Sequence, residues 1–188
     1  MKFWVGILFA VGLTACSSSQ DTTTWYQLPE SEAKPAGAIT TGAKRLLWVD
    51  QVTVPDFLAG NGVAYQTSDV KYVIAKQHLW ASPLDQQLRD TLVANLAGAL
   101  PGWVVSARPL GHDQDVISVT ISGFHGRYDG HVVVKGDWLL NHQGTYIKQP
   151  FSVVLPQQGD GYGPMVKTLG DAWRQEAMSM ASSIRNVR

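Results

Sequence analysis

Apolar residues recur along this 188-residue chain with two different periods, one typical of strands and one typical of helices. Over residues 117–122, apolar and polar residues alternate as in a half-buried strand. Asp129-Gly130 is a strong signal for a two-residue hairpin turn, so the strand is expected to return over 131–140 and again over 145–155. Further strands are predicted at residues 25–29, 45–54, 63–66, 70–75 and 103–107.

Two segments carry apolar residues at helical spacing. Ser82 is a typical N-cap, Pro83 fits the first helical position, and Pro101 ends the segment. Its leucine stripe comprises Leu84, Leu88, Leu92, Leu96 and Leu100. A second stripe over 166–184 predicts a helix that packs on the sheet, not a cofactor site. We therefore predict one α+β domain over 25–188, with a mixed, mostly antiparallel sheet and two main helices on one face.

The first sixteen residues follow another pattern. Lys2 precedes an apolar run over 3–13, and the run ends in Leu13-Thr14-Ala15-Cys16, the lipobox pattern of bacterial lipoproteins. The run is too short to cross a hydrocarbon core of about 30 Å. We predict a signal peptide over 1–15 and a lipidated N-terminus with a flexible tether over 16–24. The alternative is an ordinary signal peptide with a coincidental cysteine.

The lipobox implies that Cys16 becomes the N-terminus and carries a thioether-linked diacylglycerol and an amide-linked acyl chain. Because one chain anchors only marginally, at about 0.8 kcal/mol per buried methylene, several chains are needed for a stable anchor. In lipoproteins of this type, aspartate directly after the cysteine favours retention in the inner membrane. Ser17 stands there instead. It is therefore the expected sorting signal, and it predicts an outer-membrane location facing the periplasm.

Composition narrows the function classes further. The chain has 15 basic and 15 acidic residues, a net charge of 0, and no basic run with interleaved aromatics, which argues against nucleic-acid binding. Its single cysteine is Cys16, so no disulfide is expected once that residue is lipidated. The tryptophans are scattered along the chain, which favours packing over a sugar or lipid site for most of them.

Candidate catalytic residues are sparse. The five histidines lack zinc-ligand spacing, and although His125 and His131 could approach across the predicted hairpin, a surface role is favoured over a metal site. There is no Gly-x-Ser-x-Gly nucleophile motif. The glycine-rich stretches 60–62 and 159–163 lack the context of a phosphate loop and are interpreted as turns. We expect no enzyme activity, no metal and no cofactor other than the lipid on Cys16.

One predicted loop, over residues 56–62, carries two large apolar side chains after a strand-ending proline. Phe57 and Leu58 could fold back over the edge of the core. Alternatively, they could form a contact surface for another subunit or partner, because exposed apolar groups on a loop usually need one. Both alternatives stay open at this point.

Long runs of the sequence resemble the auxiliary lipoproteins of ABC-type transport systems. The runs are residues 45–62, 63–75 and 79–84, the hairpin 126–130, and 138–144. This resemblance implies a non-enzymatic role in intermembrane phospholipid transport, which supports envelope integrity. It further implies that the protein docks a mammalian-cell-entry (MCE) protein spanning the periplasm, and that it forms a homo-oligomeric ring through which phospholipid passes. A periplasmic carrier of lipid or a small ligand is the alternative, and a periplasmic hydrolase is disfavoured by the missing motifs.

Overall fold

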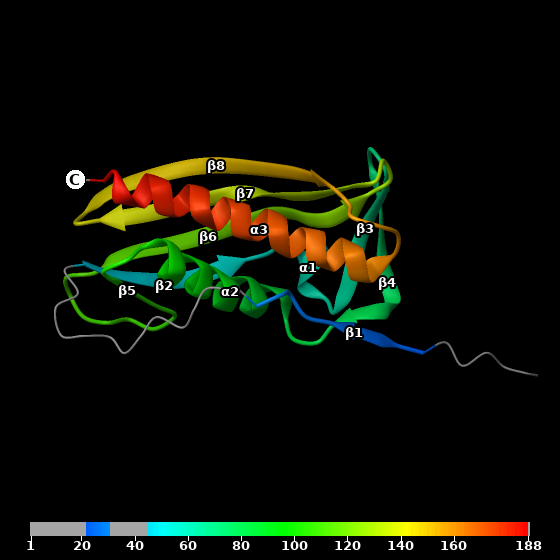
Figure 1. Ribbon diagram of the computed structural model, residues 1–188, viewed down its shortest axis with the longest axis horizontal. Coiled ribbons are helices and arrows are strands. Elements are labelled where there is room, and N and C mark those ends of the chain that lie inside the picture. The colour runs from blue at the N-terminus through cyan, green and yellow to red at the C-terminus, as the bar shows by residue number, and fades with distance from the viewer. Residues whose placement is uncertain (1–21, 31–44, 188) are drawn as a thin grey trace, which may run out of the picture.

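The computed structural model describes residues 22–30 and 45–187 (Figure 1). In chain order, the elements are β1 (Thr24–Tyr26), β2 (Arg45–Thr53), α1 (Asp56–Ala59), β3 (Gly62–Ser68), β4 (Lys71–Trp80), α2 (Leu84–Ala99), β5 (Trp103–Ser106), β6 (Asp115–Arg127), β7 (His131–His142), β8 (Thr145–Pro156) and α3 (Tyr162–Arg185). The predicted α+β class and the predicted meander, β6 to β8, are confirmed.

The long strand β6 organises an eight-stranded mixed sheet. The antiparallel strand β7 follows β6 along one edge, and β8 pairs antiparallel with β7. On the other edge, β2 pairs parallel with the first part of β6, and β3 pairs parallel with its last two residues. Strand β5 extends the sheet beside β2, and β4 and β1 extend it beside β3. The strand β6 therefore joins two sub-sheets, and β3, β4 and β1 stand at one end of the molecule (Figure 1).

A bulge bends β6 where the partner strand changes. The register with β7 shifts between Ile121 and Gly123, and Gly136 lies opposite Ile121. A Cβ atom on Gly136 would collide with the carbonyl oxygen of Thr120, so β7 can approach the bend closely only with glycine at this position.

Both long helices cover the same face of the sheet (Figure 1), where they contact each other. All five leucines of the α2 stripe are buried, and so are Trp173 and Met180 of α3. The Trp173 indole N–H donates to the carbonyl oxygen of Leu88 at 3.1 Å, which joins the two helices inside the core. The main source of stability is the burial of these stripes. Each large apolar side chain that is fully buried contributes about 1.5–3 kcal/mol.

The beginning of α2 differs from the prediction. Pro83, not Ser82, occupies the N-cap position, and no side chain caps the helix. The Ser82 carbonyl oxygen instead accepts a hydrogen bond from the Gln87 side-chain amide at 2.7 Å. The same amide group accepts the Leu28 backbone N–H through its oxygen at 2.8 Å. Gln87 thereby fixes the segment after β1 to the helix.

Two other boundaries also differ. Residues 56–62 were expected to form a loop, but they contain the short helix α1 and the first residue of β3. Strand β4 runs to Trp80, beyond the predicted end at residue 75, because its last residues pair with β1 and Trp80 enters the core. In the parts of the chain described here, no helix is both long enough and apolar enough to cross a bilayer.

Candidate docking site

The short helix α1 separates the two apolar residues that were considered together. Pro55 ends the preceding strand, and its carbonyl oxygen accepts the Leu58 backbone N–H at 2.8 Å. The turn directs Leu58 into the core, where it is 1% exposed, and leaves Phe57 37% exposed. Leu58 therefore folds over the edge of the core, as the first alternative predicted. The prediction that Leu58 forms a contact surface together with Phe57 is wrong for Leu58, because its side chain is buried. Phe57 remains the candidate contact residue.

Phe57 belongs to a row of rings that crosses from α1 to the sheet. Its ring centroid lies 5.2 Å from that of Tyr72 on β4, and Tyr72 meets His125 of β6 edge-on at 5.0 Å. The Tyr72 hydroxyl is 3.4 Å from His125 Nε2. Because Tyr72 is 39% exposed, Phe57 and Tyr72 together form an apolar patch that a partner could cover.

His125 is buried, contrary to the expected surface role. Its Nδ1 lies 3.1 Å from the Gly126 carbonyl oxygen, an acceptor, so Nδ1 carries the proton and Nε2 faces Tyr72. Desolvation by burial lowers the pKa of His125 below its usual value, and the Gly126 hydrogen bond opposes that effect. The neutral ring is therefore a packing element beneath the patch.

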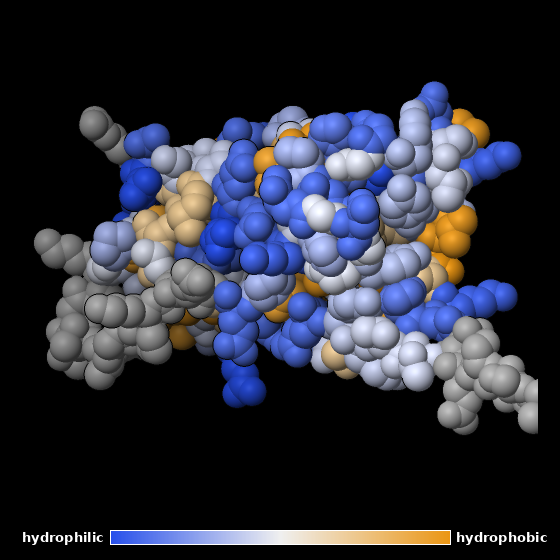
Figure 2. Space-filling view, turned by 45° about the vertical axis from the view of Figure 1, so that its right-hand side comes forward, coloured by the Kyte–Doolittle hydropathy of each residue, from blue (hydrophilic) through white to orange (hydrophobic). Residues whose placement is uncertain are grey.

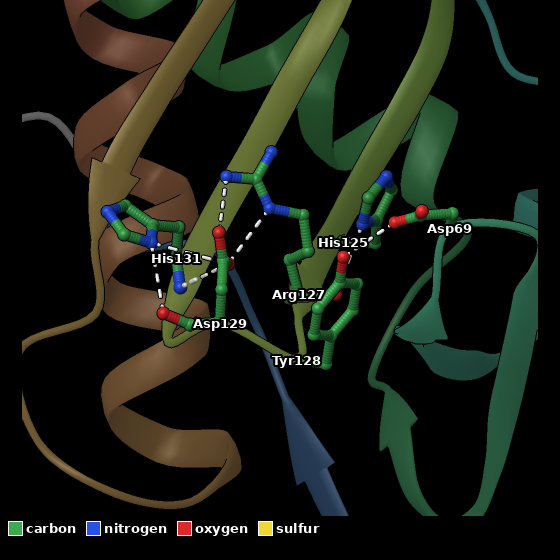
Figure 3. Close-up of polar contacts among 7 residues, drawn as sticks. Asp69, His125, Arg127, Tyr128, Asp129 and His131 are labelled. Carbon is green, nitrogen blue, oxygen red and sulfur yellow. Dashed lines mark hydrogen bonds and ion pairs between the residues drawn. The ribbon is translucent and has the colours of Figure 1, made fainter.

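The other histidine of this hairpin stands apart. In the β6–β7 ladder, His125 lies opposite Val133 and His131 lies opposite Arg127. The two imidazoles also have different contacts, since His125 meets Tyr72 and the Gly126 carbonyl oxygen. The His131 Nδ1 contacts Asp129 instead, at 3.3 Å (Figure 3). Within residues 22–30 and 45–187, no group of three or more histidine, cysteine or acidic side chains is arranged to hold a metal ion.

The tips of two hairpins are joined side by side at this end of the molecule. Tyr128, in the β6–β7 turn, donates its hydroxyl proton to Asp69 of the β3–β4 turn at 2.6 Å (Figure 3). This hydrogen bond to a carboxylate raises the pKa of Tyr128. Arg127 donates two hydrogen bonds to Asp129, at 2.9 and 2.7 Å, and these hold the Asp129 pKa well below its usual value. The tips thus form one connected surface.

A pocket of about 540 Å³ lies between these tips and the start of α3. It is lined by Tyr65, Tyr128, Gly130, Gln157, Gly159, Asp160, Gly161, Tyr162 and Met165. Gly159 and Gly161 have positive φ angles of 99° and 94°, so residues 159–161 turn as predicted. The prediction extended the turn to residue 163, but Tyr162 and Gly163 already belong to α3. Tyr162 stacks on His78 with centroids 3.9 Å apart, and His78 Nδ1 lies 3.0 Å from the Tyr26 hydroxyl. The pocket is an open surface feature, suited to a contact and not to enclosing a ligand.

Cys16 and Ser17 lie outside the described residues, so their roles stay predictions. Sequence reasoning also missed the residues that form the row of rings and the joined tips. Tyr72, Tyr128 and Asp69 carry no motif, and only their register in the sheet brings them together. The one signal in the sequence was the run Tyr72-Val73-Ile74, which places apolar side chains on both faces of a strand.

Residues 22–30 and 45–187 form an α+β domain built on a branched mixed sheet, and the pocket beside α3 is open to the surface. The model of the family described as ABC-type transport auxiliary lipoprotein component matches residues 26–181. The chain belongs to this family of transport auxiliary lipoproteins.

Its relatives include proteins named Intermembrane transport lipoprotein PqiC from Escherichia coli (strain K12) and from Shigella flexneri. Each is 57% identical over 187 residues, which cover 100% of this chain and 100% of the relative. A crystal structure of a protein described only as uncharacterized is 61% identical, has a TM-score of 0.79, and covers 87% of this chain and 99% of its own. Protein XCC0632 from Xanthomonas campestris is 16% identical with a TM-score of 0.70 over 86% of this chain and 94% of its own, which shows the fold alone.

Proposed function

We propose that this protein is the outer-membrane lipoprotein of an MCE-type intermembrane phospholipid transport system. In this role it is anchored through lipid on Cys16 and docks a periplasm-spanning, PqiB-like MCE-domain protein at the outer membrane, which supports envelope integrity. The observation that carries the proposal is the 57% identity over the whole chain with lipoproteins named for intermembrane transport. The relatives are transport auxiliary lipoproteins, so the role is one of docking and not of catalysis.

The proposed assembly is a homo-oligomeric ring. A ring needs a heterologous contact, in which one surface of each subunit meets a different surface of the next. The patch of Phe57 and Tyr72 supports such a contact, since both rings are more than a third exposed and are already packed together. The second candidate function, a carrier of lipid, would need an enclosed apolar cavity, and the pocket near α3 is instead open and lined by tyrosine, glycine and polar residues.

The test is affinity purification of the full lipoprotein from crosslinked, gently solubilised envelopes. Recovery of an MCE-domain protein with several copies of this chain would support the proposal. A lone monomer that carries lipid would overturn it in favour of the carrier. The Phe57→Ala variant should yield fewer crosslinked copies, whereas Met178→Ala, which removes an apolar side chain 42% exposed on α3, should yield as many as the wild type.

A further inference from the structure

We propose that the end of the domain formed by the joined tips of the β3–β4 and β6–β7 hairpins rests on the surface of the bilayer. The occupant of this surface is phospholipid, and the inference rests on the lipid anchor of the proposed function. It adds an orientation: the end with the tips faces the membrane and the opposite end faces the periplasm.

The direction of β1 indicates the end of the domain at which the described chain begins. Strand β1 pairs parallel with β4, and Thr24 stands opposite His78. Parallel strands run the same way, so β1 follows the direction of residues 78–80 of β4. The register between β3 and β4 shifts between Ile74 and Leu79, so this direction holds for the last part of β4 alone. In Figure 1, β1 is entered from the right-hand end of the molecule, where both hairpin tips also lie. The described part of the chain therefore begins at the end that carries the tips.

The length of chain between Cys16 and Thr24 limits which parts of the domain can reach the bilayer. Cys16 is eight residues from Thr24, and eight extended residues span at most about 28 Å. His78 is seven residues along β4 from Lys71, about 23 Å or less. The tips are thus within reach of a bilayer that holds Cys16. The β7–β8 turn lies a whole 12-residue strand away from the tips, about 40 Å, so the opposite end cannot reach the same surface.

This end of the domain exposes large apolar side chains, which suit contact with a bilayer. Eleven large apolar side chains are exposed in the described part of the chain. Apart from Tyr72, which belongs to the proposed subunit contact, five of them lie on β1, the β3–β4 hairpin or the β6–β7 turn: Trp25, Val70, Val73, Ile74 and Tyr128. Val70 at the turn is 84% exposed, the highest value among them, and Trp25 at the chain entry is 57% exposed. Figure 2 shows apolar side chains gathered at this end. Tryptophan and tyrosine are the residues enriched where protein meets the headgroup layer.

Charge at the tips is balanced. Arg127 is paired with Asp129 at 2.7 Å, and Asp69, which accepts the Tyr128 hydroxyl, is two residues from Lys71 at the start of β4. Because no net charge is left to attract anionic headgroups, the contact rests on shallow burial of Val70 and the aromatic rings. The contact should therefore persist in high salt.

The experiment uses the lipidated protein in vesicles of phosphatidylethanolamine with a minority of phosphatidylglycerol. Cys16 is the single cysteine and its sulfur is occupied by lipid, so one introduced cysteine is the only thiol that a fluorescent label can reach. Labels at Val70→Cys and Tyr128→Cys should be quenched several-fold more by lipid-attached quencher than a label at Tyr146→Cys. Tyr146 is the matched control, since it is 66% exposed beside the β7–β8 turn at the far end.

Flotation of the same vesicles separates the possible failures. Protein that floats but shows equal quenching at all three positions overturns the orientation and leaves the anchor intact. Labels at Val70 and Tyr128 that are shielded from water but not quenched by lipid mean a protein interface at the tips, which also overturns it. Protein that fails to float overturns the anchor and this inference together.

Discussion

Glu176 on α3 is a carboxyl group enclosed between helix and sheet. It is 5% exposed, and desolvation raises its pKa to about 7, although a hydrogen bond from Trp138 opposes the shift. In the unfolded chain the pKa of this carboxyl group is near its ordinary value of 4.5. The folded state therefore binds a proton that the unfolded state has released. The stabilising contribution is fully present below about pH 4.5 and is lost as the pH rises through about 7.

Glu176→Gln should accordingly stabilise the protein at pH 8 and have little effect near pH 4.5. The glutamine is neutral at every pH, so it avoids ionisation in the core, and the expected gain at pH 8 is about 3 kcal/mol. Denaturant unfolding of both variants at the two pH values measures the difference. His125, whose pKa is lowered by burial, gives the stability the opposite pH dependence. This contribution cancels in the difference between the two proteins, because both contain His125. An equal change at both pH values would contradict the pKa shift of Glu176.

Gly136 marks the place where two strands come closest. Gly136→Ala places a methyl group against the Thr120 carbonyl oxygen, and because this is backbone it cannot move aside as a side chain could. We expect a loss of about 1–3 kcal/mol in the free energy of unfolding. Gly60→Ala is the control, since nothing lies within 4 Å of its Cβ position. Equal stability of the two variants would show that the β6 bend relaxes freely.

At the scale of elements, the two apolar residues of α1 have different roles: Leu58 packs in the core, and Phe57 is the candidate contact residue. Leu58→Ala should lower the free energy of unfolding by about 2–5 kcal/mol, because it leaves a cavity in the core. Phe57→Ala should cost about 1 kcal/mol or less, as it removes one ring from an exposed pair. Thermal or denaturant unfolding of both variants distinguishes these values. A large loss for Phe57→Ala would mean that its main role is in the fold.

Local patterns along the chain account for the elements that form from neighbouring residues. The leucine stripe located α2, and Asp129-Gly130 located the β6–β7 turn, because periodicity and turn chemistry act over a few residues. The parallel pairing of β2 and β3 with β6 was not predictable, because strands far apart in the sequence leave no local mark of their partners. Strand β4 was predicted too short for the same reason, since polar residues such as Lys76 interrupt the pattern before Trp80 reaches the core.

In the candidate site too, residues recognisable from local sequence could be predicted, and residues that depend on distant partners could not. Phe57 was proposed from the sequence as a contact residue, because a large apolar residue next to a strand-ending proline is visible as a pattern. The structure leaves its ring exposed, and its contact with a partner stays a prediction. Its neighbour Leu58 had the same pattern but the opposite orientation, which only the turn of α1 decides. Tyr72 and Tyr128 could not be assigned, since each gains its role from a partner more than fifty residues away in the sequence.

For the whole molecule, the proposed function makes attachment to the membrane depend on a single side chain, Cys16. Cys16→Ala removes the only sulfur that can carry the diacylglycerol, so the precursor should not be processed by the lipoprotein route. Because a chain without this anchor loses the methylene burial that holds it, the protein should disappear from outer-membrane fractions. Fractionation and acyl labelling measure this. Normal outer-membrane labelling of Cys16→Ala would contradict the anchor.

The destination of the anchored molecule is a separate property, and we predict that it depends on Ser17, the residue after Cys16. Ser17→Asp should shift the protein toward the inner membrane, because aspartate in this place favours retention there in lipoproteins of this type. The lipid and the folded domain are unchanged, so Ser17→Asp should still be acylated and still float with vesicles. Ser18→Asp adds the same charge one residue later and should stay in the outer membrane. Equal fractionation of the two variants would mean that residues beyond position 17 determine the sorting, while the anchor on Cys16 would stand.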